Sequence, residues 1–235
     1  MRLKDLKADF RNAAAPEKAA LLARYFKTGK GEYAEGDRFL GLTVPVTRGL
    51  AKKHRGLPFA DVKALLKSPW HEERAAALLL LEERFSGGGA AERKAIYEFY
   101  LANTRYINNW DLVDMSAPCI VGGWLKDKDR KPLYGLAGSE LLWDRRIAVL
   151  ACFNFIKDGE SADALAIARG LLDDGHDLLH KAVGWMLREI GKKCSEDVLL
   201  GFLKDNYARL PRTALRYAIE RFPAARRKRL LAGNF

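Results

Sequence analysis

Apolar residues recur every three to four positions along most of the chain, the spacing that gathers them on one face of an α-helix. The pattern is clear over residues 68–85, 143–156 and 180–193. No stretch alternates with the period of two that is typical of a strand. Segments with glycine or other turn-forming residues separate the periodic stretches, at 28–37, 86–89 and 173–177. The sequence therefore predicts an all-α protein.

The helix predicted around Trp185 has two distinct faces. One face carries the apolar residues Leu179, Val183, Met186 and Ile190. Another face carries Lys181, Trp185 and Arg188. Trp185 is therefore expected to lie away from the main core. Gly184 costs a helix about 1 kcal/mol relative to alanine, which predicts that something approaches the backbone closely at this position.

The stretch INNWDLVD, residues 107–114, raises the question of a functional site. Asn108 or Asn109 can cap a helix that starts near Trp110, and Asp111 then lies in the first turn, where the helix dipole favours a carboxylate. Trp110 and Asp114 are four residues apart and share a face of that helix. They are either ordinary packing or part of a site. Ser68 followed by Pro69 predicts another helix start.

Successive helices carry comparable residues near their first turns. These residues are Arg74, Trp110, Arg146, Lys181 and Arg212, at spacings of 36, 36, 35 and 31. A period of this length with two helices per repeat is typical of a HEAT-type α-solenoid. We predict one domain over 1–235, with an N-terminal helical segment at 1–55 and repeats from about 57 onward. Its second helices would line a curved, basic concave groove that follows phosphates.

The charge balance favours a polyanionic partner. The chain has 235 residues and a formal net charge of +11, which points to nucleic acid rather than to an acidic small molecule. Cys119, Cys152 and Cys194 are expected to be free thiols in a reducing compartment. The charged N-terminus and the absence of a long apolar stretch predict a cytoplasmic protein that does not enter a membrane.

Four blocks of the sequence resemble, in the same order, the AlkD family of bacterial DNA alkylation repair glycosylases. The blocks are FLGLTVPVTR at 39–48, NNWDLVD at 108–114, WDRRIAVL at 143–150 and KAVGWMLREIGKK at 181–193. The combination is specific, although each block alone is weak. The resemblance implies an array of HEAT-like repeats wrapped around duplex DNA. It also implies release of purines alkylated at N3 or N7, by a bacterial protein.

The resemblance assigns roles to individual residues. Trp110, Asp114 and Trp185 match the residues that surround the deoxyribose of the lesion. Arg146 matches the arginine that contacts phosphate, with Arg145 as the other register. Tyr25 matches an N-terminal tyrosine, but a loop at 28–38 that is longer than the family's separates it from FLGL. The repeat and charge patterns add further DNA-binding candidates, namely Lys181, Arg188, Arg74 and Arg212.

This chemistry requires few groups. An N3- or N7-alkylated purine is cationic, so it departs as a neutral base without a general acid. A carboxylate such as Asp114 stabilises the oxocarbenium character that develops on the sugar and orients water toward C1′. The indoles of Trp110 and Trp185 add cation–π stabilisation of about 0.5–2 kcal/mol each. We predict a monomeric, monofunctional glycosylase that uses no metal or other cofactor and acts on double-stranded DNA containing alkylated bases.

Other interpretations compete with this one. Without the resemblance, tryptophans are more often core residues, Asp114 is a carboxylate favoured by the helix dipole, and Arg146 is a surface residue. A non-catalytic DNA-binding HEAT-repeat paralogue would keep the basic groove and lose the carboxylate or the tryptophans. A HEAT scaffold that binds another protein would bind DNA with weak salt dependence. No lysine is placed as a Schiff-base nucleophile, so strand cleavage is not predicted.

Overall fold

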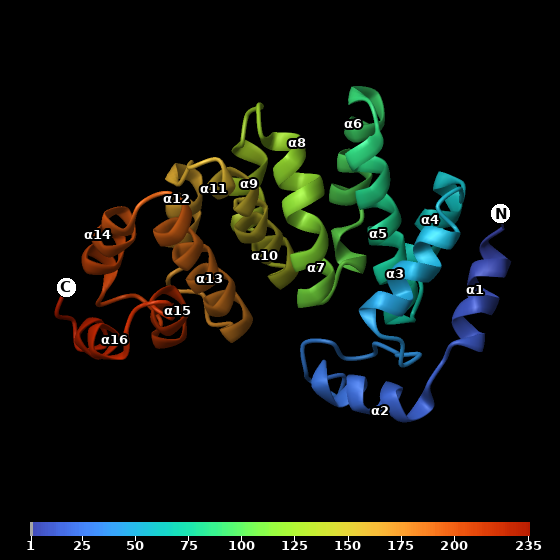
Figure 1. The fold of residues 1–235 in the computed structure, drawn as a ribbon, viewed down its shortest axis with the longest axis horizontal. Helices are drawn as coiled ribbons and strands as arrows, with labels where there is room; N and C mark the ends of the chain where they lie inside the picture. Colours follow the sequence, from blue (N-terminus) through green and yellow to red (C-terminus); the bar gives the residue numbers. More distant parts are fainter. Residues whose placement is uncertain (1) are drawn as a thin grey trace. The chain divides into compact units, whose positions relative to one another are not determined.

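The computed structural model describes residues 2–235, which form helices joined by turns and loops without any β-strand (Figure 1). Within these residues, extended pairing is limited to an isolated bridge between Arg38 and Trp70. Helices pack in succession against their neighbours, as in an α-solenoid of HEAT-like repeats. The predicted all-α fold class is confirmed.

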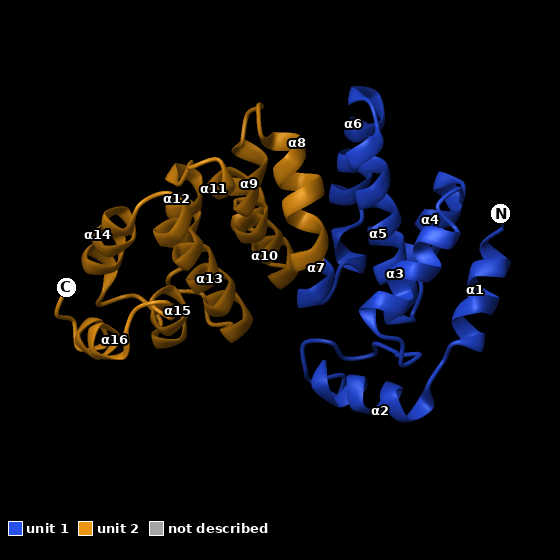
Figure 2. Cartoon of the chain, viewed as in Figure 1, with its two compact units in different colours: residues 1–112 blue, residues 113–235 orange. Residues whose placement is uncertain are grey.

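The chain divides into two compact units, residues 1–112 and residues 113–235 (Figure 2). The division falls inside helix α7 (Trp110–Ala117), after Leu112. It does not coincide with the break near residue 55 that the sequence predicts. The assignment of 1–235 to one domain stays a prediction.

Unit 1 is organised around the long helix α5. Its helices are α1 (Leu3–Asn12), α2 (Pro16–Tyr25), α3 (Val44–Lys53), α4 (Phe59–Leu66), α5 (His71–Gly87), α6 (Ala90–Leu101), the short 3-10 helix η1 (Thr104–Tyr106) and the first turn of α7. Helix α5 packs against α3, α4 and α6. The run from Ala76 to Leu81 is buried throughout, which explains why this stretch is apolar on every side.

The loop between α2 and α3 is tied to the start of α5. The carboxylate of Glu72 accepts hydrogen bonds from the backbone amides of Leu40, Gly41 and Leu42 at 2.8–3.1 Å. Gly41 has a φ of +86°, and a Cβ at this position would lie 2.1 Å from the carbonyl oxygen of Ala15. Glycine is therefore required in FLGL because the chain turns there directly against the start of α2.

The start of α5 differs from the prediction. The helix begins at His71, and Trp70 rather than Ser68 is its N-cap residue. The amide of Arg38 donates to the carbonyl of Pro69 at 3.1 Å, and the amide of His71 donates to the carbonyl of Arg38 at 2.8 Å. These bonds hold Pro69 to His71 in an extended pairing, so the helix cannot start at Pro69.

Unit 2 is organised around the long helix α13. Besides the rest of α7, it contains the π-helix η2 (Pro118–Gly122), α8 (Gly123–Leu125), α9 (Lys131–Ala137), α10 (Leu142–Ala151), α11 (Phe153–Lys157), α12 (Ala162–Gly170), α13 (Asp177–Lys193), α14 (Glu196–Asn206), α15 (Arg212–Ala218) and α16 (Ala224–Leu231). Helix α13 packs against every helix from α10 to α15. All three cysteines lie in this unit and are free thiols, as predicted.

The two predicted faces of α13 are confirmed. Leu179, Val183, Met186 and Ile190 are all buried. Lys181, Trp185 and Arg188 are each partly exposed. A Cβ on Gly184 would lie 2.5 Å from the carbonyl oxygen of Ala214 and 2.6 Å from the Cβ of Tyr217. The close approach predicted at Gly184 is therefore made by α15, and the glycine lets the two helices pack tightly.

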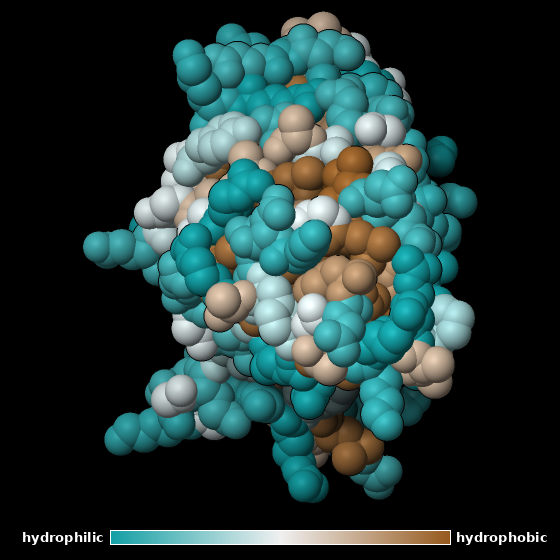
Figure 3. Space-filling model, turned by 90° about the vertical axis from the view of Figure 1, so that its left-hand side faces the viewer, coloured by the Kyte–Doolittle hydropathy of each residue, from teal (hydrophilic) through white to brown (hydrophobic). Residues whose placement is uncertain are grey.

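The C-terminal end of unit 2 carries an apolar patch bordered by polar side chains (Figure 3). A hollow of about 460 Å³ lies at α15 and α16, lined by Arg216, Ile219, Ala224, Arg227, Lys228 and Leu231. Arginine and lysine therefore surround an apolar floor at this end of the chain. The basic run Arg226 to Arg229 lies on α16, and three of its four residues are exposed.

Candidate functional site

Helix α7 begins directly at Trp110. The side-chain oxygen of Asn109 accepts a hydrogen bond from the Trp110 amide at 2.8 Å, and Asn109 is fully buried. The Oδ1 atom of Asp111 accepts from the Leu112 amide at 2.9 Å, so Asp111 serves the first turn as predicted. Asn108 instead donates to Asp37 at 3.4 Å. Of the two asparagines, Asn109 is therefore the one bound to the first helical amide.

The indole of Trp110 is partly exposed and belongs to an aromatic cluster of unit 1. It stacks on Phe26 with ring centroids 5.2 Å apart, and the edge of Tyr25 meets it at 6.1 Å. Its N–H donates to the hydroxyl of Tyr33 from the loop between α2 and α3. Tyr25 itself is 65% exposed. The structure thus brings Tyr25 and Trp110, two of the residues predicted for the site, into contact.

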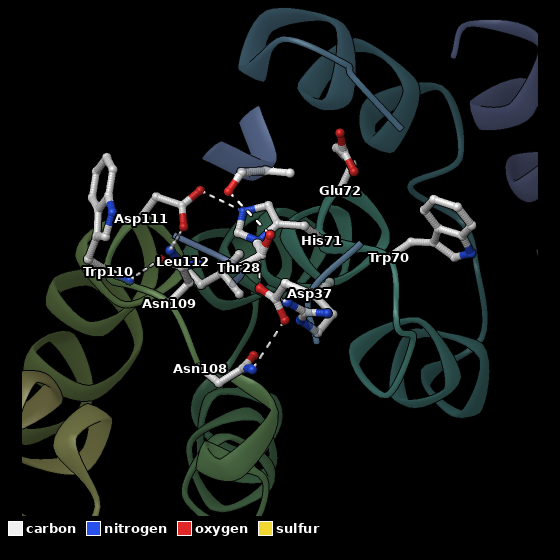
Figure 4. A network of polar contacts seen from close by, with 12 residues as sticks. Thr28, Asp37, Trp70, His71, Glu72, Asn108, Asn109, Trp110, Asp111 and Leu112 are labelled. Carbon is white, nitrogen blue, oxygen red and sulfur yellow. Dashed lines mark hydrogen bonds and ion pairs between the residues drawn. The ribbon is translucent and has the colours of Figure 1, made fainter. Parts of the chain in front are cut away.

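His71 lies beside this cluster in a buried polar network (Figure 4). Its Nε2 atom is 2.8 Å from Asp111, and its Nδ1 atom is 3.4 Å from Asp37. Burial alone would lower the pKa of His71, but the hydrogen bonds with Asp111 and Asp37 outweigh it and raise the pKa above its ordinary value. Burial would raise the pKa of Asp37, and the contacts with His71 and Arg74 lower it instead. The network therefore holds opposite charges together.

Asp114 forms a two-pronged ion pair with Arg146 in unit 2. The Nε and Nη2 atoms of Arg146 donate to the two carboxylate oxygens, each at 2.7 Å. The side chain of Asp114 is 17% exposed and that of Arg146 is 5% exposed. Arg146 also donates to the carbonyl of Leu178 at the start of α13. The arginine therefore orients the carboxylate and connects α7 of this unit with α13.

Trp185 lies two turns further along α13. Its ring is partly exposed and is tilted against Phe153 at a centroid distance of 6.2 Å. It therefore belongs to neither the buried core nor the Asp114–Arg146 pair. Trp110 belongs to unit 1 and Trp185 to unit 2.

The predicted DNA-binding cations differ in accessibility. Lys181 pairs with Asp177 at 2.8 Å and keeps 39% of its side chain exposed. Arg212 is exposed and donates to the carbonyl of Leu231 at 2.9 Å. Arg145 pairs with Asp174 and Arg188 with Glu220, and their side chains are less than one fifth exposed. Lys181 and Arg212 are therefore the most accessible cations of this set.

Arg74 and Arg146 occupy buried positions. Arg74 is 3% exposed, and it donates to Asp37 at 2.7 Å and to the carbonyl of Ser68 at 3.0 Å. Arg146 is 4% exposed and paired with Asp114. Their guanidinium groups are therefore held by internal carboxylates, and the phosphate contacts predicted for them stay predictions.

Sequence reasoning did not identify the residues that support Trp110. Phe26, Phe39, Tyr33, Asp37 and His71 come from the segment after α2 and from the start of α5. They lie 39 to 84 residues before Trp110, and no motif or period connects them to it. Only the tertiary fold of unit 1 brings them together.

The described part of the chain holds neither a cluster of metal ligands nor a helix suited to a membrane. No three His, Cys, Asp or Glu side chains gather closely enough there to hold a metal ion. None of the helices formed by residues 2–235 has both the length and the apolar character that crossing a bilayer requires. His176 and His180, at the start of α13, have local roles, because His176 accepts from the Leu178 amide and His180 contacts the carbonyl of Asp174.

Comparison with known proteins gives the chain a family. Residues 6–222 match the family described as "DNA alkylation repair enzyme". A solved structure titled "Predicted DNA alkylation repair enzyme from Enterococcus faecalis" has a similar fold, with a TM-score of 0.69 and 19% identity over 90% of this chain and 97% of that one. No curated protein matches significantly. The family supports a role in repairing alkylated DNA and implies DNA as the substrate. Because the match covers most of its length, the chain belongs to the DNA alkylation repair enzyme family.

Proposed function

We propose that the protein is a monofunctional DNA glycosylase that excises cationic N3- and N7-alkylated purines from duplex DNA. The observation that carries this proposal is the carboxylate of Asp114, oriented by its two hydrogen bonds with Arg146 and still 17% exposed. Asp114 lies in the NNWDLVD block, on which the family resemblance depends. The family match over residues 6–222 supports a role in the repair of alkylated DNA.

The ion pair suits Asp114 to electrostatic catalysis. The orientation of a carboxylate held by a guanidinium is fixed before the substrate arrives. Arg146 binds both carboxylate oxygens, so the plane of the carboxylate is fixed. Asp114 can therefore face a developing positive charge without first reorganising.

The proposed reaction is hydrolysis of the N-glycosidic bond. Both electrons of the C1′–N bond leave with the alkylated purine, which is cationic before the step and neutral after it. The sugar becomes oxocarbenium-like, and Asp114 stabilises that charge. Water then adds to C1′ and loses a proton. The products are a free base and an abasic site, and the DNA strand remains intact.

Other residues would bind the substrate. We propose that Trp110 in unit 1 and Trp185 in unit 2 offer indole faces to the cationic nucleotide, since both rings are partly exposed. Lys181 and Arg212 would contact phosphates, with smaller contributions from the paired residues Arg145 and Arg188. Tyr25, which is 65% exposed, would contact DNA from unit 1. In this proposal the lesion is recognised through sugar and backbone rather than in a base-flipping pocket.

The test is incubation of the purified protein with duplex DNA that contains N7-methylguanine and N3-methyladenine, followed by chromatography of the released bases. We expect release well above the spontaneous rate, with strand breaks only after alkaline treatment. Salt-dependent DNA binding without base release would favour a non-catalytic DNA-binding protein. Neither binding nor release would favour a scaffold for another protein. Strand breaks without alkali would contradict the monofunctional assignment.

A further inference from the structure

Trp110 is supported by aromatic rings from outside its own helix. Its indole stacks on Phe26 at a centroid distance of 5.2 Å and an interplanar angle of 23°. Phe26 stacks in turn on Phe39 at 5.1 Å and 16°. Phe26 and Phe39 are both buried, whereas Trp110 is partly exposed. The indole is therefore the accessible end of a stack whose other members belong to the core of unit 1.

His71 contacts this stack and also the backbone turn that carries Trp110. Its ring lies 4.6 Å from Phe39 and 5.1 Å from Phe26. Its Nε2 atom reaches Asp111, the residue after Trp110, at 2.8 Å (Figure 4). The side chain of His71 is 4% exposed. One buried imidazole thus touches both the rings beneath the indole and the first turn of α7.

The charges around His71 favour the imidazolium form. Asp111 from α7 and Asp37 from the loop before α3 each face a ring nitrogen. Both nitrogens are donors only when the ring is protonated, so only the cation satisfies both carboxylates. Arg74 from α5 is the other charged neighbour, and it pairs with Asp37 at 2.7 Å. Burial would lower the pKa of His71, but the two carboxylates raise it.

We propose that His71 is a positioning residue for Trp110. Through its ion pair with Asp111 and its stacking with Phe26 and Phe39, it fixes the plane of the indole before DNA binds. The consequence for catalysis rests on the proposed function, in which Trp110 faces the damaged nucleotide. The positioning itself is a property of unit 1 and can be measured without DNA.

The experiment compares His71→Gln with His54→Gln. His54 is a matched control, because it is also buried in unit 1 and its Nε2 atom lies 2.8 Å from a carboxylate, that of Asp9 on α1. The first measurement is acrylamide quenching of Trp110 fluorescence, taken as the difference between each protein and the same protein with Trp110→Phe. The second is the single-turnover rate of base release from methylated duplex DNA. The third is affinity for undamaged duplex.

We expect His71→Gln to increase quenching of Trp110 and to lower the rate of base release on the order of tenfold, since a misplaced ring contributes less to the transition state. Affinity for undamaged duplex should stay unchanged. His54→Gln should leave quenching and rate unchanged even if its melting temperature falls equally. In the wild type, quenching of Trp110 should rise as the pH is raised above 6.5 and His71 loses its proton. His71→Gln should abolish this pH dependence.

The outcomes separate the two proposals. Unchanged quenching of Trp110 in folded His71→Gln would overturn the positioning role, whatever the activity. If the wild type releases no base, the glycosylase proposal is refuted. Increased quenching of Trp110 in His71→Gln would still support the positioning role in that case. If His71→Gln does not fold, Asp111→Asn keeps the aromatic stack and removes one charge beside the ring. Asp111→Asn must then increase quenching of Trp110, and unchanged quenching would overturn the proposal.

Discussion

The two units hold their candidate residues by different physical means. In unit 1, Trp110 rests on a stack of aromatic rings, and the carboxylate of Asp37 receives hydrogen bonds from several donors, among them Arg74 and Asn108. In unit 2, the guanidinium of Arg146 donates to both carboxylate oxygens of Asp114 and orients that carboxylate. In unit 1 the support therefore includes stacked rings, whereas in unit 2 it includes a two-pronged ion pair.

Two arginines that recur with the sequence repeat have the same role in the two units. Arg74 and Arg146 are 72 residues apart, which is two periods of 36. Both are buried, and each pairs at 2.7 Å with a carboxylate, Asp37 or Asp114. The periodic arginine therefore serves as an internal connector in both units. A basic residue that recurs with the repeat does not by itself indicate a basic surface.

The largest effect is expected for Asp114→Asn. Loss of the negative charge should lower the single-turnover rate of base release about 100- to 1,000-fold, the usual loss when one preorganised electrostatic group is removed. Duplex affinity should change little, because the substitution adds no repulsion toward phosphate. Rate and affinity are measured on the same methylated duplex.

The matched control for that variant is Asp163→Asn. Asp163 also accepts from an arginine in unit 2, Arg130 at 2.8 Å, and its side chain is 21% exposed. The Asp163→Asn variant should lose a comparable ion pair, and its rate of base release should stay at the wild-type value. Equal losses of rate in both variants would mean that Asp114 acts only through the stability of unit 2.

The second effect concerns stability and compares Arg146→Met with Arg74→Met. Arg146→Met removes both charge-assisted bonds to Asp114 and should lower the free energy of unfolding by about 3 kcal/mol. Arg74→Met should cost less, because Asp37 keeps His71 and Asn108 as neighbours. Urea denaturation of both variants checks the order. A larger loss for Arg74→Met would mean that His71 and Asn108 do not compensate Asp37 for the lost guanidinium.

The helices and the two faces of α13 could be predicted from the sequence because both depend on local periodicity. Leu179 and Ile190 are buried and Trp185 is not, as the spacing predicts. The predicted start of α5 was wrong because Pro69 and His71 pair with Arg38, which lies more than 30 residues earlier in the chain. Tertiary pairing decides such positions.

The candidate site also combines a local motif, which the sequence shows, with partners that are distant in the sequence. The motif around Trp110 and Asp114 can be recognised without coordinates. The burial of Arg146 depends on a carboxylate 32 residues away, and the contact of His71 with Asp111 spans 40 residues. No pattern in one sequence encodes pairs at those distances, so the groups that orient the motif could not be predicted.

The third effect is a difference in pH response. Burial raises the pKa of Glu82 in unit 1 to about 7, although the charge of Arg48 opposes the shift. A folded pKa above the unfolded value of 4.5 means that stability falls as the pH rises from 4.5 to about 7. Glu82→Gln should therefore raise the free energy of unfolding at pH 8 on the order of 3 kcal/mol and leave it unchanged at pH 4.5.

Unit 2 contains the opposite case. Burial lowers the pKa of His176, so its contribution to stability falls as the pH drops below 6.5. His176→Asn keeps a side chain that can cap α13, and it should stabilise the protein at pH 5.5 and not at pH 8. Denaturation of both variants at these pH values measures the two responses. A gain from Glu82→Gln at pH 4.5 as large as at pH 8 would mean that titration is not its cause.

The smallest effect separates a proposed DNA contact from an ordinary surface lysine. Lys181 in unit 2 and Lys94 in unit 1 each pair with a carboxylate four residues away on the same helix, Asp177 or Glu98. Such surface pairs contribute at most about 0.5 kcal/mol, so both alanine variants should fold normally. Lys181→Ala should reduce the slope of log affinity against log salt by about one, because one phosphate contact is lost. Lys94→Ala should leave that slope unchanged. An equal reduction in both would indicate that net charge, rather than a contact at α13, governs DNA binding.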